Sequence, residues 1–163
     1  KSFVYTFFGS GGTGARPNKD GLSATAFPSG VLGTPVEVIE TLAPLLVERK
    51  ALRDGSGGDG RFRGGLGQGL AFRVLSDDPA TCSVLCDRTT IPAQGFFGGE
   101  PGATGKVLIN GKAPANPKAE QTLQPGDLIE ILMPGGGGYG PPAERDPALR
   151  ERDRLEGYTT SPR

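Results

Sequence analysis

The sequence predicts an α+β fold that is mostly β. Short strands are expected to form a β-rich barrel or sandwich-like module, with a short helix after Thr34 and a C-terminal helix. Apolar segments recur at a spacing of roughly ten residues between residues 45 and 133, which is typical of such modules. The 28 glycines and 15 prolines alternate with these segments and indicate tight turns between them. The length of 163 residues fits one domain of ordinary size.

In the N-terminal third, residues 2–9 are aromatic and β-branched and predict a strand. A glycine-rich loop follows. The next helix is expected over residues 34–43, with Thr34 as N-cap, Pro35 at the first helical position and Glu37 closing a capping box. Pro44 ends that helix, and residues 45–53 then read as a strand with charged residues on its exposed side.

The middle of the chain predicts further strands, separated by glycine loops, over residues 70–76, 81–87, 105–111 and 127–133. Turn signals stand at Asn110-Gly111 and at Pro125-Gly126. The tail predicts a charged helix with Asp146 as N-cap, Pro147 at its first position and Gly157 as C-cap. With little apolar surface, this helix is expected to pack on another part of a larger protein or to lie exposed.

Composition excludes several functions. The chain has no histidine, so neither a Ser-His-Asp nor a Cys-His catalytic group can be completed within it, and a His-ligated catalytic metal is excluded. The net charge of +0 indicates no nucleic-acid or membrane partner, and no apolar run approaches the ~20 residues of a membrane span. Two cysteines fit a reduced cytoplasmic protein. The start at Lys1, within an apolar pattern, suggests a fragment or a processed product.

Two motifs suggest ligands that their surroundings do not support. GSGGTG (residues 9–14) matches the dinucleotide fingerprint, but ARPNKDG follows it where a helix would have to begin. Cys82 and Cys86 would share one side of a strand, whereas a structural zinc needs four ligands. The favoured interpretation is a pair of buried, unreactive thiols.

Charged residues offer a second set of candidates. Three arginines could clamp a carboxylate or phosphate: Arg61, Arg63 and Arg88. Alternatively they are solvated or bridge loops to Asp54, Asp59 or Asp87. Asp20 and Glu37 could act as acid–base groups or metal ligands, although the capping box already accounts for Glu37.

The run PGGGGYGPP (residues 134–142) is unusual, because each glycine costs about 0.5–1 kcal/mol relative to alanine. Glycine loops of this kind can be plain turns, or their bare N–H groups can form a nest or admit another backbone. A definite apolar strand precedes this run and Tyr139 follows it. These borders favour an ordered loop that is pressed against another backbone.

An ordered set of segments resembles the C-terminal part of the hydantoinase B/oxoprolinase family. The segments are YTFFGSGGTGARPNKDGLSATAFPSGVLGTPVEVIE, LRDGSGGDGRFRGGLGQ, PGDLIEILMPGGGGYGPPAERDPALRERD and EGYTT. The resemblance implies ATP-dependent opening of a cyclic imide or lactam of the hydantoin or 5-oxoproline type, in which phosphorylation of the amide oxygen prepares the ring for attack by water.

The same resemblance implies partners and cofactors. They are the upstream remainder of the subunit, a hydantoinase A-like ATPase subunit and a small cyclic amide substrate. ATP and a divalent metal are expected in the complete enzyme, bound mainly outside this chain, since the family's metal ligands include histidines. The chain would divide into the end of the catalytic-core region (residues 1–53), a β-rich module (residues 54–140) and a charged helical tail (residues 141–163).

The resemblance identifies no catalytic residue. It implies candidates that border the substrate chamber: Gly11, Gly12, Gly14, Asp20, Thr34, Glu37, Arg61 and Arg63. A second set forms a loop or interface: Gly135, Gly136, Gly137, Gly138 and Tyr139. Three alternatives stay open: a non-catalytic docking module for an ATPase partner, an acetone carboxylase-like subunit fragment, and a free-standing glycine-rich ligand-binding domain. Thr25, Ala26 and Phe27 stand where many relatives are rich in histidine, which favours the hydantoinase type.

Overall fold

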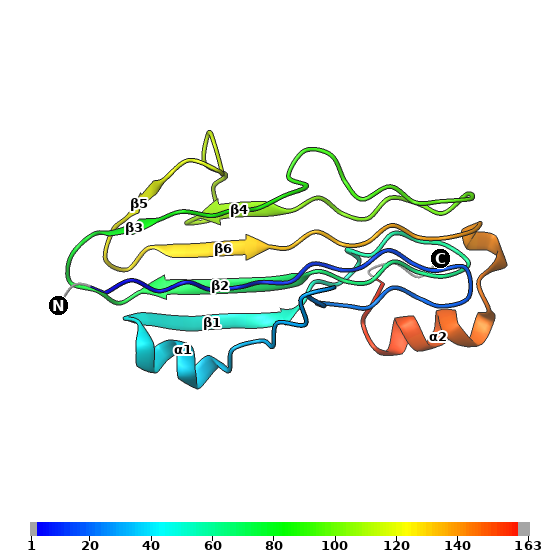
Figure 1. Cartoon of the computed structure of the whole chain (residues 1–163), viewed down its shortest axis with the longest axis horizontal. Coiled ribbons are helices and arrows are strands. Elements are labelled where there is room, and N and C mark those ends of the chain that lie inside the picture. The colour runs from blue at the N-terminus through cyan, green and yellow to red at the C-terminus, as the bar shows by residue number, and fades with distance from the viewer. Residues whose placement is uncertain (1–2, 160–163) are drawn as a thin grey trace.

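The computed structural model describes residues 3–159 and shows an elongated molecule with a sheet at one end and glycine-rich segments at the other (Figure 1). Four antiparallel strands pair in the order β1 (Leu45–Leu52), β2 (Gln68–Val74), β6 (Leu128–Leu132) and β4 (Lys106–Ile109). Two further strands, β3 (Ala80–Cys82) and β5 (Gln121–Leu123), form a separate antiparallel pair. The mostly β class is confirmed, and both sheets are open.

Three helical elements complete the described chain. α1 (Val36–Leu42) packs beside β1 at the sheet end, while the 3₁₀ turn η1 (Pro142–Glu144) and α2 (Pro147–Leu155) lie at the opposite end (Figure 1). Both predicted helices are therefore present. Within residues 3–159, no helix combines the length and the apolar character that crossing a bilayer requires.

The core lies on one face of the four-stranded sheet. Leu70, Phe72 and Val74 alternate along β2 and are buried, as the two-residue period of a strand requires. The pairing register places Ile131 opposite Leu70 and Ile129 opposite Phe72, so the apolar faces of β2 and β6 coincide. Apolar residues from outside the sheet cover this face: Tyr5, Phe7, Ile39, Val84 and Cys86.

Most strands of the sheet were predictable within a few residues, and so were its turns. Asn110 and Gly111 both have positive φ (50° and 76°), and Ile109 and Lys112 exchange two backbone hydrogen bonds around them. This is the geometry of a two-residue hairpin. Gly126 has a φ of 85° in the turn that opens β6. The three-residue strand β5 was not predicted, because its sequence QTL carries no strand pattern.

Three local predictions are wrong. Residues 3–9 pair with no strand of the described chain, and only Cys82 and its predecessors form β3 in the predicted strand 81–87. The capping box does not form, because Pro35 stays extended (ψ 149°) and becomes the N-cap itself. The helix therefore begins at Val36, one residue later than predicted, and the Thr34 carbonyl accepts a hydrogen bond from Lys50 Nζ.

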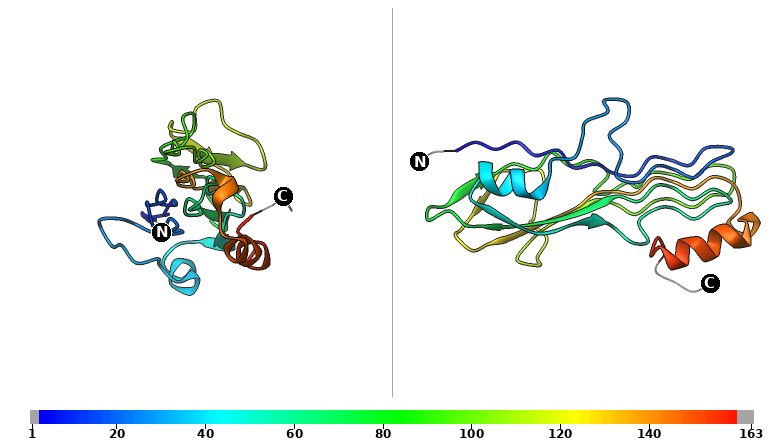
Figure 2. Two further views of the ribbon diagram at one scale, coloured as in Figure 1. Left: turned by 90° about the vertical axis from the view of Figure 1, so that its right-hand side faces the viewer. Right: turned by 90° about the horizontal axis from the view of Figure 1, so that it is seen from below.

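The other half of the molecule is a bundle of extended segments without a β-ladder. We call residues 11–23, 56–67, 94–103 and 134–140 the glycine bundle; its segments run side by side (Figures 1 and 2). Gly136 N and Tyr139 N donate to Gly65 O and Phe62 O, both at 2.9 Å. Three residues therefore separate successive bonds to the same neighbour, which is the repeat of a polyproline II helix.

The same repeat holds towards the other neighbours of this run. Gly135 N and Gly138 N donate to Ala103 O and Glu100 O, at 3.1 and 2.9 Å. Gly12 N and Ala15 N donate to the carbonyls of residues 134 and 137, both at 2.9 Å. Residues 134–139 are thus the central segment, bonded on different sides to different parts of the chain.

Close backbone approach explains the glycines. A Cβ on Gly136 would overlap the Thr13 carbonyl and lie 2.8 Å from Gly14 N. A Cβ on Gly64 would overlap Gly136 itself. Only glycine leaves room for backbones this close. The prediction of an ordered loop against another backbone is confirmed, and the neighbouring backbone belongs to the chain itself.

Candidate functional site

The C-terminal helix is fixed at both ends as the sequence predicts. The Asp146 carboxylate accepts a hydrogen bond from Ala148 N (2.7 Å), and Pro147 occupies the first helical turn. Gly157 follows the helix with a φ of 70°. The helix lies against the end of the glycine bundle (Figures 1 and 2), so the expectation that it lies exposed or packs only on another part of a larger protein is wrong.

A buried ionic cluster holds α2 in place; it comprises Asp20, Arg63, Arg145 and Asp153. The Arg145 guanidinium donates to both Asp20 oxygens at 2.8 Å. Its Nε donates to Asp153 Oδ2 at 2.9 Å. One arginine thus bridges two carboxylates that are 133 positions apart in the sequence, which places the start of the bundle against the C-terminal helix.

Arg63 completes the ionic cluster from the glycine bundle. Its Nε lies 3.4 Å from Asp153 Oδ1, and its guanidinium also donates to the Gly64 carbonyl (2.6 Å). The centre of the Tyr158 ring lies 4.9 Å from the guanidinium carbon, a cation–π distance. Asp153 is 1% exposed and Arg63 is 4% exposed. Charges buried to this degree require pairing, and here each has an opposite charge beside it.

Asp20 is the carboxylate on the N-terminal side of the ionic cluster. Burial alone would raise the pKa of Asp20. Hydrogen bonds from the Arg145 side chain and the Arg63 amide, with the charges of both arginines, outweigh burial and hold that pKa below its ordinary value. Asp20 is therefore held ionised, and it acts as a hydrogen-bond acceptor rather than as a proton donor.

The lowered pKa makes the ionic cluster sensitive to acid. A carboxyl whose pKa is lower in the folded state stabilises the fold above its unfolded pKa and loses this effect as the pH falls through the folded pKa. We therefore expect Asp20→Asn to flatten the loss of unfolding free energy below about pH 4, as measured by urea denaturation between about pH 7 and pH 3. Asp87→Asn is the control, since the Asp87 side chain is 95% exposed. Equal acid slopes for the parent and Asp20→Asn would contradict the expectation.

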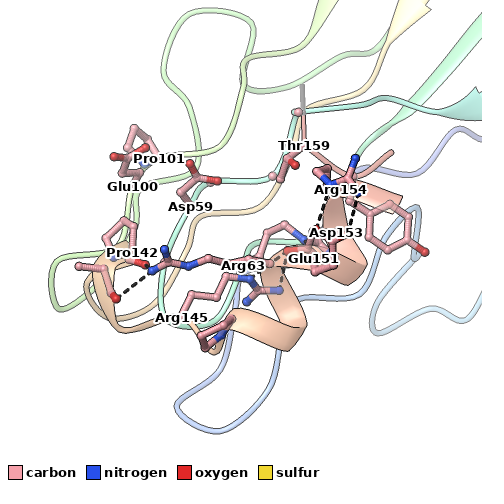
Figure 3. Close-up of a pocket in the computed structure, with 18 residues that line it drawn as sticks. Asp59, Arg63, Glu100, Pro101, Pro142, Arg145, Glu151, Asp153, Arg154 and Thr159 are labelled. Carbon is pink, nitrogen blue, oxygen red and sulfur yellow. Dashed lines mark hydrogen bonds and ion pairs between the residues drawn. The ribbon is translucent and has the colours of Figure 1, made fainter. Parts of the chain in front are cut away.

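A cavity of about 530 Å³ opens between α2 and the glycine bundle (Figure 3). Arg63, Arg145 and Asp153 line it, together with the backbone of residues 57 and 58. Further lining arginines are already engaged: Arg150 donates to the carbonyls of residues 142 and 143, and Arg154 pairs with Glu151 at 2.6 Å. The cavity is polar, and its cations bind carboxylates and carbonyls of the chain.

The structure brings two of the predicted site residues together, Asp20 and Arg63. Arg63 N donates to Asp20 Oδ1 at 2.8 Å. Arg61 lies outside the ionic cluster, with its side chain 57% exposed and 3.9 Å from Glu144. The carboxylate partners of Arg61 and Arg63 are thus Glu144 and Asp153, and the suggested bridges from these arginines to Asp54 or Asp87 are wrong.

The remaining candidates are spread over the molecule. Gly11 and Gly12 lie inside the glycine bundle, where a Cβ would meet Pro134 and Gly65, whereas Gly14 has more room, with its nearest contact 3.9 Å away. Thr34 and Glu37 lie at α1, at the opposite end from α2 (Figure 1). The eight candidates therefore do not gather at one place within the described residues.

Sequence reasoning missed Arg145, Asp153 and Tyr158. All three lie in the tail, where the charged pattern ERDPALRERDRLEG predicts a solvated helix. Nothing in that pattern marks Asp153 as different from the exposed Glu151. Its burial depends on the distant Arg63 and on Arg145, which periodicity along the helix does not reveal.

Metal-binding groups are absent from the described part of the chain. Among residues 3–159, no group of three or more cysteine, aspartate or glutamate side chains is placed to hold a metal ion. Cys82 and Cys86 are free thiols on the core side of their segment, as predicted. Burial raises the pKa of the Cys82 thiol, which makes this thiol less reactive.

Comparison with curated proteins gives three informative relatives. An uncharacterized protein of Methanocaldococcus jannaschii is 44% identical over 71% of this chain and 21% of its own length. The B component of a D-/L-hydantoinase from Pseudomonas sp. is 32% identical over 97% of this chain and 28% of its own length. The 5-oxoprolinase of Dictyostelium discoideum is 36% identical over 80% of this chain and 10% of its own length. The chain thus spans between a tenth and about a quarter of these relatives.

Two solved structures share the fold. The ATP-dependent caprolactamase of Pseudomonas jessenii superposes with a TM-score of 0.74 and 29% identity, over 92% of this chain and 28% of that one. A nucleotide-free acetone carboxylase structure gives a TM-score of 0.74 and 25% identity, over 93% of this chain and 25% of that one.

The family comparison agrees with these neighbours. A model of the hydantoinase B/oxoprolinase family matches residues 1–142, which include the sheet and the whole glycine bundle. The chain belongs to the hydantoinase B/oxoprolinase family.

Proposed function

We propose that this chain is the C-terminal part of a hydantoinase B-like subunit in an ATP-dependent cyclic amidohydrolase that opens hydantoin or 5-oxoproline-type rings. One observation carries the proposal: 97% of the chain matches 28% of the Pseudomonas hydantoinase component. The names of the 5-oxoprolinase relative and of the caprolactamase fold neighbour point to cyclic amides, which supports the same substrate class. A cytoplasmic location is part of the proposal and is motivated by the two free thiols.

The role that we propose for this part of the subunit is a rigid wall beside the substrate site. The glycine bundle joins four distant segments through backbone hydrogen bonds, which leaves it few soft torsions. The ionic cluster fastens the C-terminal helix to it. Its charged groups neutralise one another, so they suit positioning better than proton transfer.

ATP and a divalent metal belong elsewhere in this proposal. The acidic side chains of residues 3–159 do not gather into a metal-binding group, and Asp20 and Asp153 are engaged by arginines. The donor set of the described chain therefore does not fit a catalytic metal. We place the metal in the upstream part of the subunit and ATP in a hydantoinase A-like partner. The division of the chain at residues 53 and 140 stays a proposal too.

Reconstitution tests the proposal. The full-length subunit, combined with its ATPase partner, should hydrolyse hydantoin or 5-oxoproline only when ATP is present. Arg63→Ala should lose turnover in proportion to the loss of folded subunit, because Arg63 is buried against Asp153. Arg61→Ala should keep turnover within a factor of about two, since exposed ion pairs of this kind contribute little. Turnover and assembly are measured on the same samples.

Each competing interpretation predicts a different result. Loss of turnover in Arg61→Ala with intact assembly would show that Arg61 acts in the site itself. A docking module would lose assembly with the ATPase while the subunit stays folded. The exposed side chains of Phe96 (67%) and Phe97 (76%), next to Tyr139, give this alternative a surface. An assembly that opens no cyclic amide with ATP would contradict the proposed function.

A further inference from the structure

We propose that residues 3–8 and residues 83–87 receive a β-strand from the part of the longer subunit that lies outside this chain. This inference rests on the proposed function only in taking the chain as part of a longer subunit. It assigns an interaction surface and commits to one occupant, an extended apolar segment of the same polypeptide.

The first segment lies across the core face of the four-stranded sheet. Residues 3–8 run extended and form a separate line beside the sheet (Figures 1 and 2). Tyr5 and Phe7 pack against the core, where the Phe7 ring meets the Phe72 ring edge-on at 5.3 Å. Val4 and Phe8 are 95% and 67% exposed. The segment is therefore apolar on both faces, the pattern of a strand that is covered on both sides.

The second segment repeats this arrangement. Residues 83–87 continue directly from β3 and pack against the same core cluster. Val84 and Cys86 are each 7% exposed, whereas Leu85 between them is 98% exposed. Alternation of buried and exposed residues is the two-residue period of a strand. An almost fully exposed leucine between two core residues leaves the outer face of this strand uncovered.

The backbones of both segments lack the bonds that strands make. Within residues 3–159, no backbone hydrogen bond joins residues 3–8 or 83–87 to each other, to the sheets or to any loop. Backbone N–H and C=O groups beside a core are nearly always paired. A row of unpaired groups on an extended segment is a template on which another strand adds.

The length of the relatives identifies the occupant. The Pseudomonas relative matches this chain with 28% of its own length, so almost three quarters of that protein lies outside the matched region. A strand from the same polypeptide is present at high effective concentration, without a separate association step. A second copy of this chain would have to bury the same large apolar side chains in a separate dimer, and its pairing would depend on protein concentration.

Hydrogen exchange on the full-length subunit tests the pairing. We expect the amides of residues 4–8 and 84–86 to exchange at least about 100-fold more slowly than unpaired amides, as amides in a stable sheet do. The protection should not change with subunit concentration. Fast exchange of these amides in the folded subunit would overturn the inference, and protection that rises with concentration would assign the surface to a second copy instead.

A matched pair of variants tests the outer face. Leu85→Asp should raise the exchange rates of residues 84–86 at least about tenfold, because a carboxylate would be buried under the added strand. Leu155→Asp is the control, since Leu155 is 70% exposed on α2. If Leu85→Asp prevents folding, Leu85→Thr, which introduces a neutral side chain that strands favour, should still give a smaller rise. Exchange rates that are equal in the Leu85 variants and the control would contradict the inference.

The outcome separates this inference from the proposed function. Protected amides in a subunit that opens no cyclic amide would leave the pairing intact and contradict the activity. ATP-dependent turnover with rapidly exchanging amides would do the reverse.

Discussion

Replacing Asp153 with alanine is expected to lower the free energy of unfolding by about 3–5 kcal/mol, one of the two largest effects that the structure predicts. Asp153 is 1% exposed and accepts from Arg145 while facing Arg63. Its removal leaves two buried guanidinium groups with Asp20 as the remaining carboxylate within the ionic cluster. Urea denaturation of the parent and the variant measures the difference.

The control for Asp153 lies two residues away. Glu151 is on the same helix and pairs with Arg154, but its side chain is 56% exposed and stands at the surface. Glu151→Ala should leave the urea midpoint almost unchanged. Asp153→Asn keeps the shape of the side chain while removing its charge, so it should also be strongly destabilised. A small effect of both Asp153 variants would show that α2 does not depend on the ionic cluster.

Gly136→Ala is the second large effect, with an expected loss of about 3 kcal/mol or more. The added methyl group would occupy the space of the Thr13 carbonyl, and the atoms that would have to move are backbone atoms. Movement of either backbone would break the hydrogen bond from Gly136 N to Gly65 O (2.9 Å). Thermal and urea denaturation both report the change.

Gly14→Ala provides the matched control inside the same bundle. A Cβ there would meet only the Gly137 carbonyl, at an ordinary 3.9 Å. Because alanine restricts the unfolded chain more than glycine does, Gly14→Ala should be neutral or stabilising by up to about 1 kcal/mol. Similar destabilisation by both substitutions would mean that close packing does not explain the glycines.

Local signals in the sequence predicted the elements whose structure is decided locally. The hairpin at Asn110-Gly111 and the caps at Asp146 and Gly157 depend on residues within one turn, and they were found. The strand predicted over residues 2–9 failed for a different reason. Its residues have strand character, but a ladder needs a partner, and the described chain supplies none.

The candidate site was predictable only in part. Asp20 and Arg63 were singled out from the sequence, and they do meet. Their partners Arg145 and Asp153 were not found, because the charged tail gives no sign of which side chain is buried. The close approach of backbones at Gly136 was expected from the density of glycines, whereas its partner Thr13 is 123 residues away and could be found only from the fold.

The position of residues 134–139 at the centre of the glycine bundle has a consequence for biosynthesis. Their hydrogen-bond partners near residues 12, 62 and 100 are all translated earlier, and without the central segment these partners have nothing to enclose. Contacts of such long sequence separation slow folding. The glycine half must therefore assemble only after the ribosome has released residue 139, and a nascent chain that stalls before residue 134 should expose this half to proteolysis.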